Sequence, residues 1–150
     1  MSADPHTTPP APVRVLVDTN VVLDVLLARE PWASEAQAVY AARDEGRMDL
    51  CLLASTITDV YYIVRKQAGR EKARESVATC LQVYTILVVT REVIERALAR
   101  MGVDFEDDVQ IAAADLEQVA YLMTRNVADF ATSPISALTP PELATLLQAP

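Results

Sequence analysis

The sequence predicts an α/β fold, a three-layer α/β/α sandwich with a central, mostly parallel sheet. Short apolar runs rich in Val, Leu and Ile, typical of strands buried on both faces, alternate with segments whose apolar residues recur at helical spacing. Strands that alternate with helices favour a parallel sheet with helices on both sides. The length of 150 residues is the common size of one domain, so we expect a single domain.

Each predicted element rests on a local pattern. Strands are predicted at residues 13–17, 50–54, 85–89 and 119–124, where short apolar runs occur. Pro31 separates the first two predicted helices, while Gly69 and Gly102 end two later ones. The predicted helices cover residues 20–29, 34–46, 55–69, 70–84, 91–102 and 107–118, and a last helix opens at Thr139 with proline in its first turn.

The composition is that of a soluble globular protein, with 51% apolar and 23% charged residues. No apolar run approaches the roughly 20 residues that span a bilayer, so we expect no membrane contact. Residues 1–12 lack the basic start and apolar centre of a secretory signal and are expected to form a flexible N-terminal tail. Cys51 and Cys80 are isolated in apolar surroundings, which favours ordinary core packing in a reduced compartment. We therefore expect a cytoplasmic protein.

Several kinds of chemistry are excluded by residues that the sequence lacks. Its 3 glycines lie far apart, so no glycine-rich phosphate loop can be built. The single histidine, His6, lies in the tail, which excludes Ser-His and Cys-His nucleophiles and paired-histidine zinc sites. The formal net charge of −8 disfavours simple nucleic-acid binding, because such affinity depends on Lys and Arg. Carboxylates must carry any chemistry, and phosphate must be handled by local positive charge or bound cations.

Four acidic residues fall where the predicted sheet would bind a ligand. In the stretch VRVLVDTNVVLDVLL, Asp18 ends an apolar strand, where a charge is costly unless something uses it. Asp59 lies in the first turn of the helix after the second strand, Asp107 opens an alanine-rich helix, and Asp129 follows the last strand. Ligands of open α/β sheets bind beyond the carboxyl ends of the strands, so these acids are expected to share one edge. A divalent cation would relieve their repulsion, and oxygen ligands suit Mg²⁺ or Mn²⁺.

Each acid also has a purely structural interpretation. Asp59 and Asp107 each stand three residues after a capping residue type, so both fit a capping box at a helix start. Asp18 could cap the first helix, and Asp129 could be an ordinary loop acid. The joint pattern of the four favours a shared metal site.

Four segments resemble, in order, the motifs of PIN-domain ribonucleases. VLVDTNVVLDVLL resembles the first motif, ASTITDVYYIVRK the second, DFEDDVQIAAA the third and LMTRNVADF the fourth. The similarity runs from about Val13 to Leu146. One such motif is weak support, whereas four in the right order are strong.

The resemblance implies a Mg²⁺- or Mn²⁺-dependent nuclease that hydrolyses RNA, built as a PIN-like nuclease domain over residues 13–150. Asp18, Asp59, Asp107 and Asp129 would be its catalytic and metal-binding residues. Asp59 stands where many members have glutamate, a departure that shortens its reach by one methylene. The site would work without a protein nucleophile, because the bound metals would activate water.

Further residues are implied in supporting or substrate-binding roles. Asn20 would be a polar support for Asp18, and Asp108 competes with the preceding residue as third ligand. Asn126 stands where many members have aspartate, and Asp129 would take up part of that role. Arg125 is expected to contact substrate phosphates. A basic stretch at residues 65–74 is either a guide for RNA or a solvated surface.

The similar proteins include the VapC-like toxins of type II toxin–antitoxin pairs as well as solitary PIN proteins. The resemblance therefore implies a homodimer and a small antitoxin partner. A catalytically degraded, dimeric binding module stays open, motivated by Asp59 and Asn126. A haloacid-dehalogenase-like domain needs a second aspartate where this chain has Asn20, and a receiver domain needs its aspartate near the middle strand, where Asp18 is not expected.

Overall fold

The computed structural model describes residues 7–148, so His6 and half of the predicted tail lie outside the described residues. Within that range five strands form one sheet: β1 (Val13–Val17), β2 (Met48–Leu53), β3 (Thr85–Leu87), β4 (Tyr121–Met123) and β5 (Ser136–Leu138). Seven α-helices and one 3-10 helix surround it within the same range: α1 (Thr19–Leu26), α2 (Trp32–Asp44), α3 (Ala54–Ala68), α4 (Arg70–Val83), α5 (Arg91–Arg100), α6 (Phe105–Leu116), η1 (Val127–Phe130) and α7 (Pro140–Gln148).

The sheet has the strand order β3-β2-β1-β4-β5, and every pair of neighbours is parallel. The predicted α/β fold with a parallel sheet is confirmed. The expectation that Asp18 lies away from the middle strand is wrong, because β1 pairs with β2 on one side and with β4 on the other. The chain first builds the sheet outward from β1 to β3 and then returns to the other side of β1.

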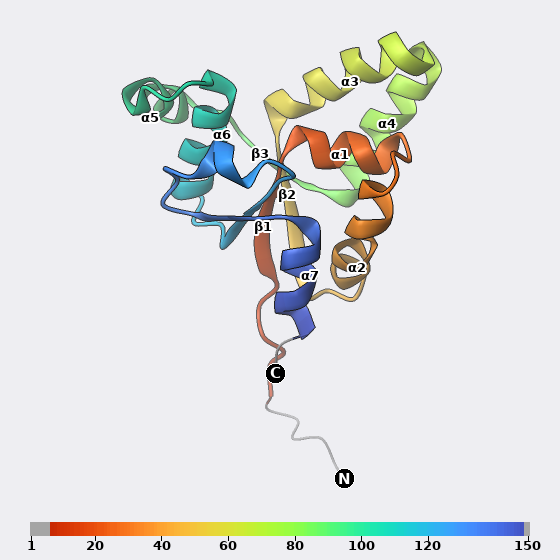
Figure 1. Ribbon diagram of the computed structural model, residues 1–150, viewed down its shortest axis with the longest axis horizontal. Helices are drawn as coiled ribbons and strands as arrows, with labels where there is room; N and C mark the ends of the chain where they lie inside the picture. The colour runs from red at the N-terminus through yellow and green to blue at the C-terminus, as the bar shows by residue number, and fades with distance from the viewer. Residues whose placement is uncertain (1–6, 149–150) are drawn as a thin grey trace.

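Helices cover both faces of the sheet, which makes the three layers visible in Figure 1. Alternate strand residues point to opposite faces, so Val15 and Val17 pack with α1, α2, α3, α4 and α7. Leu16 lies on the other face and packs with α5, α6 and η1. The run of seven consecutive buried residues from Asp108 to Ala114, three of them alanines, lets α6 lie close against that second face.

Most predicted elements occur with boundaries shifted by one to three residues. The predicted last helix is α7, where Thr139 and Glu142 bond reciprocally to each other's backbone N–H groups in a capping box. The strand β5 was not predicted, because its three residues are too short to show a pattern and it bonds to β4 alone. The predicted core positions of Cys51 and Cys80 are confirmed, since both are buried and neither forms a disulfide.

The longest helix of residues 7–148 is α3, with 15 residues. None of the helices in this range combines the length and the apolar character that crossing a membrane requires.

Candidate functional site

The site lies where β1 and β4 end side by side at the centre of the sheet. After β1 the chain enters α1 on one face, and after β4 it enters η1 on the other face. Two neighbouring strands whose connections leave to opposite faces open a crevice at their carboxyl ends. Asp18 stands at this point, and its backbone N–H donates to the Met123 carbonyl of the neighbouring strand at 2.9 Å. The topology therefore places the end of β1 beside the loop that follows β4.

Asp18 is a buried carboxylate, 8% exposed, and both of its oxygens accept hydrogen bonds. Gln110 Nε2 on α6 donates to Oδ1 at 3.0 Å, and Thr124 Oγ1 after β4 donates to Oδ2 at 2.9 Å. Asp18 is the N-cap residue of α1, yet its side chain makes no capping bond. The capping interpretation is therefore wrong for its carboxylate, which instead faces α6 and the end of β4. Two donors hold this carboxylate in one orientation.

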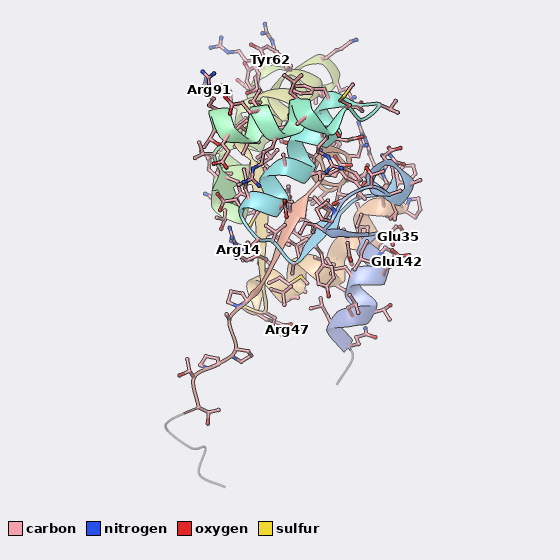
Figure 2. All side chains as sticks on the ribbon, turned by 90° about the vertical axis from the view of Figure 1, so that its left-hand side faces the viewer. Arg14, Glu35, Arg47, Tyr62, Arg91 and Glu142 are labelled. Carbon is pink, nitrogen blue, oxygen red and sulfur yellow. The ribbon has the colours of Figure 1, made fainter. Side chains whose placement is uncertain are left out.

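A cavity of about 440 Å³ opens beside Asp18. It lies at the same end of the molecule as Tyr62, which lines it and is labelled near the top of Figure 2. Asn20 and Asn126 also line it. Six carboxylate residues from four parts of the fold make up most of the remaining wall: Asp18, Asp59, Asp104, Glu106, Asp107 and Asp129. All four acids predicted from the sequence thus surround one space.

The start of α6 supplies the acids opposite Asp18. Asp104 caps this helix, and its Oδ1 accepts from the backbone N–H groups of Glu106 at 2.9 Å and of Asp107 at 3.2 Å. The cap predicted three residues before Asp107 is confirmed. Burial, together with the charges of Asp104, Asp18, Asp129 and Glu106, raises the pKa of Asp107 to about 7. Burial and the repulsion between the carboxylates thus keep a proton on Asp107 up to near neutral pH.

Asp108 faces away from the cavity, although it follows Asp107 directly. Its carboxylate is 5% exposed and accepts from the Gly102 backbone N–H at 2.8 Å and from Arg100 Nε at 3.3 Å. The Arg100 guanidinium also donates to the Thr132 carbonyl at 3.2 Å. Asp108 thereby ties α5, α6 and the segment after η1 together. Of the two adjacent acids, Asp107 is the one that lines the cavity.

Asp59 lies in the second turn of α3, because this helix begins at Ala54, one residue earlier than predicted. Its predicted position in the first turn is therefore wrong, and with it the capping interpretation. Glu106 stands near it, and its Oε1 accepts from Thr19 Oγ1 at 3.4 Å. Burial raises the pKa of Glu106, with the charge of Asp59 as the next cause. This corner of the cavity combines acids from α3 and α6.

Arg125 lies between Thr124 and Asn126 in the chain but does not line the cavity. Its Nε stands 2.8 Å from Oδ2 of Asp24, which is 1% exposed, and its guanidinium lies 4.1 Å from the centre of the Trp32 ring. Arg29 reaches the other oxygen of Asp24 at 3.8 Å. In this arrangement Arg125 anchors the loop after β4 to α1 and α2. Its predicted contact with substrate phosphate stays a prediction.

The donors around the cavity fit a hard divalent cation in their chemistry, since they are carboxylate and amide oxygens. In the described range 7–148, however, no three His, Cys, Asp or Glu side chains stand close enough together to hold a metal ion as placed. Binding of an ion would therefore require the carboxylates to rotate inward or to act through water.

Three residues of the site were not assigned a role from the sequence. Glu106 was hidden among neighbouring acids at a helix start, and Gln110 and Thr124 are neutral residues inside apolar segments. For Gln110 and Thr124 the sequence did contain a signal, which is a polar residue inside an apolar segment that is expected to be buried. Gln110 is 2% exposed and Thr124 is fully buried, so both needed a polar partner.

Residues 14–128 match the PIN domain family. No curated protein matches the chain. Among solved structures, a toxin–antitoxin complex from Klebsiella pneumoniae has 23% identity and a TM-score of 0.61, over 84% of this chain and 97% of that chain. A DNA-bound VapBC from Salmonella typhimurium has 16% identity and a TM-score of 0.68, over 85% and 98%. VapC20 from Mycobacterium tuberculosis, a sarcin-ricin loop cleaving toxin, has 16% identity and a TM-score of 0.60, over 72% and 86%. At these identities the similarity shows a shared fold.

Proposed function

Because the chain belongs to the PIN-domain family, we propose that it is a Mg²⁺- or Mn²⁺-dependent ribonuclease that hydrolyses RNA phosphodiester bonds. The observation that carries this proposal is the convergence of six carboxylates on one cavity at the carboxyl end of β1. Such a concentration of negative charge is destabilising by itself, and a bound cation would turn it into a binding site.

Within this proposal Asp18, Asp107 and Asp129 supply the ligands at the centre of the site, and Asp59 supplies the outer corner. A divalent cation bound there lowers the pKa of water and neutralises charge that develops on the phosphate. Gln110 and Thr124 hold the Asp18 carboxylate in place, so that little reorganisation is needed when an ion arrives.

Substrate would be positioned by the neutral residues of the cavity. The side-chain amides of Asn20 and Asn126 can donate hydrogen bonds to phosphate oxygens without adding charge. Tyr62 is 60% exposed and lines the cavity, so its ring can stack on an unpaired base. The exposed basic stretch at residues 65–74, where α3 ends and α4 begins, would attract the RNA backbone toward an otherwise acidic protein.

The experiment that tests the function compares the wild-type protein with Asp18→Asn on a mixture of total tRNA and rRNA. Wild-type protein is expected to cleave RNA with Mn²⁺ and to stop with EDTA, and Asp18→Asn is expected to be inactive while keeping its fold. Asp115→Asn is the matched control, because Asp115 is exposed at the far end of α6, outside the cavity. Equal cleavage by wild type and Asp18→Asn would end the nuclease proposal.

We further propose that the protein acts in the cytoplasm as the toxin of a type II pair, as a homodimer bound by a small antitoxin. Support comes from the shared fold with the Klebsiella toxin–antitoxin complex and the Salmonella VapBC. A short reading frame for a DNA-binding protein beside this gene, whose product co-purifies with the chain, is the expected finding. A chain that stays monomeric by light scattering would contradict the dimer.

The second candidate is a binding module whose metal site has degraded. The spacing of the carboxylates favours this module, because in the observed arrangement no three acidic side chains of residues 7–148 are close enough together to bind one ion. Micromolar Mn²⁺ binding with no cleavage of any RNA tested would favour this module over the nuclease.

A further inference from the structure

Asp59 and Glu106 form a wall shared by two cavities. Both residues line the cavity that contains Asp18, and both also line an adjoining cavity between α3, α5 and α6. Thr56, Phe105 and Gln110 line only the second of these spaces. A pair of acids that lines two adjoining spaces can contact a ligand in either of them.

Glu106 points to a different side of the site from Asp107. Successive residues of an α-helix are about 100° apart, so these two side chains leave α6 in different directions. The charges of Asp104 and Asp18 raise the pKa of both residues, whereas the charge of Asp129 acts on Asp107 and that of Asp59 acts on Glu106. The Thr19 hydroxyl holds Glu106 on this second side, at 3.4 Å.

Gln110 provides an independent sign that this corner binds something. Its Nε2 donates to Asp18, which fixes the orientation of the amide and turns Oε1 away from Asp18. The residue is 2% exposed, and its Oε1 is buried without a hydrogen-bond donor among residues 7–148. An acceptor buried in this way destabilises the fold unless a donor reaches it. The adjoining cavity, which Asp59 and Glu106 also line, is a place from which such a donor can come.

We propose that Asp59, Glu106 and Gln110 Oε1 form an oxygen-lined corner that holds the hydration shell of a divalent cation next to Asp18, which makes Glu106 a cation-binding residue of this protein. The inference rests on the proposed function, because the ion is the one that the central acids would bind. Mg²⁺ and related hard ions keep several of their waters in proteins. A water bound to such an ion donates strongly, and it can satisfy Gln110 Oε1 and the two carboxylates together.

The test measures Mn²⁺ binding by isothermal titration calorimetry on protein stripped with EDTA. Glu106→Gln keeps the size of the side chain and removes its charge, and it is expected to weaken Mn²⁺ binding about tenfold or more, as loss of an outer-shell partner does. Glu106→Asp keeps the charge at shorter reach and is expected to bind with intermediate affinity. Glu75→Gln is the matched control, since Glu75 is an exposed glutamate on α4 that lines neither cavity.

A readout that does not depend on activity accompanies the titration. Mn²⁺ is expected to raise the melting temperature of wild type and Glu75→Gln clearly more than that of Glu106→Gln, while circular dichroism verifies that all variants fold. Glu106→Gln binding Mn²⁺ as tightly as wild type, while Asp18→Asn does not bind, would overturn the role of Glu106 and leave the proposed function intact. A wild-type protein that binds no Mn²⁺ and cleaves no RNA would overturn both.

Discussion

The raised pKa of Asp107 makes the stability of the metal-free protein depend on pH near neutrality. Burial and the neighbouring acids raise this pKa from 3.8 to about 7, so the folded protein retains a proton that the unfolded chain has already lost. A carboxyl group whose pKa is higher in the folded protein than in the unfolded chain stabilises the fold when it is protonated. This stabilisation is complete at pH values below the pKa of the unfolded chain, and it is lost as the pH rises through the pKa of the folded protein. The free energy of unfolding should therefore fall between pH 6 and pH 8.

The size of the effect follows from linkage. A single group with these two pKa values loses about 1.4 kcal/mol of stability between pH 6 and pH 8. Asp107 is partly exposed, so screening by solvent reduces this to about 0.5–1 kcal/mol, or about 2 °C in melting temperature for a chain of this length. Glu106 has a pKa raised by burial and by Asp59, and it acts in the same direction.

The assay is thermal unfolding in EDTA at pH 6 and pH 8 for wild type and Asp107→Asn. Wild type should melt at a lower temperature at pH 8, and the substitution should remove most of that difference because a side-chain amide does not titrate. Mn²⁺ should stabilise wild type more at pH 8 than at pH 6, since binding of the ion displaces the proton. Identical pH dependence in wild type and Asp107→Asn would refute the claim that the acids of the cavity are electrostatically coupled.

Three further predictions concern the framework around the site. Arg125→Ala should lower the free energy of unfolding by about 3 kcal/mol in urea titrations, because among residues 7–148 it leaves the buried Asp24 carboxylate with Arg29, at 3.8 Å, as its one cation. A loss as small as that of exposed Lys66→Ala would contradict this. Gly102→Ala should cost about 1–3 kcal/mol in the same assay, because its Cβ would lie 2.5 Å from Asp108 Oδ1, and an unchanged midpoint would show that the loop relaxes freely. Cys51 and Cys80 are buried, and burial raises the pKa of each thiol to about 11, so both should react with a thiol reagent at pH 8 only after unfolding; labelling of the native protein within minutes would be the contrary result.

The position of Asp18 could be predicted because its physical cause is local. A charged residue at the end of an apolar strand can be recognised from a few neighbouring residues of the sequence. The topology of a parallel sheet then fixes the edge on which that residue lies. The positions of Asp59 and Asp129 at the same edge follow from the order of strands and helices. For this reason four acids spread over most of the chain were predicted to share one space, and all of them line the cavity.

The choice between Asp107 and Asp108 depends on how the chain turns between α5 and α6. Asp108 bonds with Gly102 and Arg100, which are six and eight residues earlier in the chain, and these bonds turn it away from the cavity. They form only because the loop between the two helices folds back on the start of α6, which the spacing of residues does not show. Arg125 looked free for substrate in the sequence, yet its partner Asp24 lies on α1, near the start of the chain. For Arg125, an ion pair with a distant segment decides whether its charge is free to bind a substrate, and the spacing of residues in the sequence does not reveal such a pair.

The role proposed for Glu106 was invisible for a different reason. In the run DFEDD every acid can be read as favourable charge at a helix start, so none stands out. Only the helical rotation between adjacent residues separates them, because it brings Glu106 under the influence of Asp59 and the next residue under that of Asp129. Strand β5 was missed because a three-residue edge strand is defined by its partner and not by its own sequence.

The most direct measurement is an X-ray diffraction experiment on a crystal soaked in MnCl₂, recorded where manganese scatters anomalously. The account predicts an anomalous peak within the cavity, bonded to oxygen atoms of Asp18 and Asp107, and no peak there in a crystal of Asp18→Asn. Manganese found only on the outer surface of the wild-type protein, or no manganese at all at millimolar concentration, would contradict the claim that these converging carboxylates are a cation site.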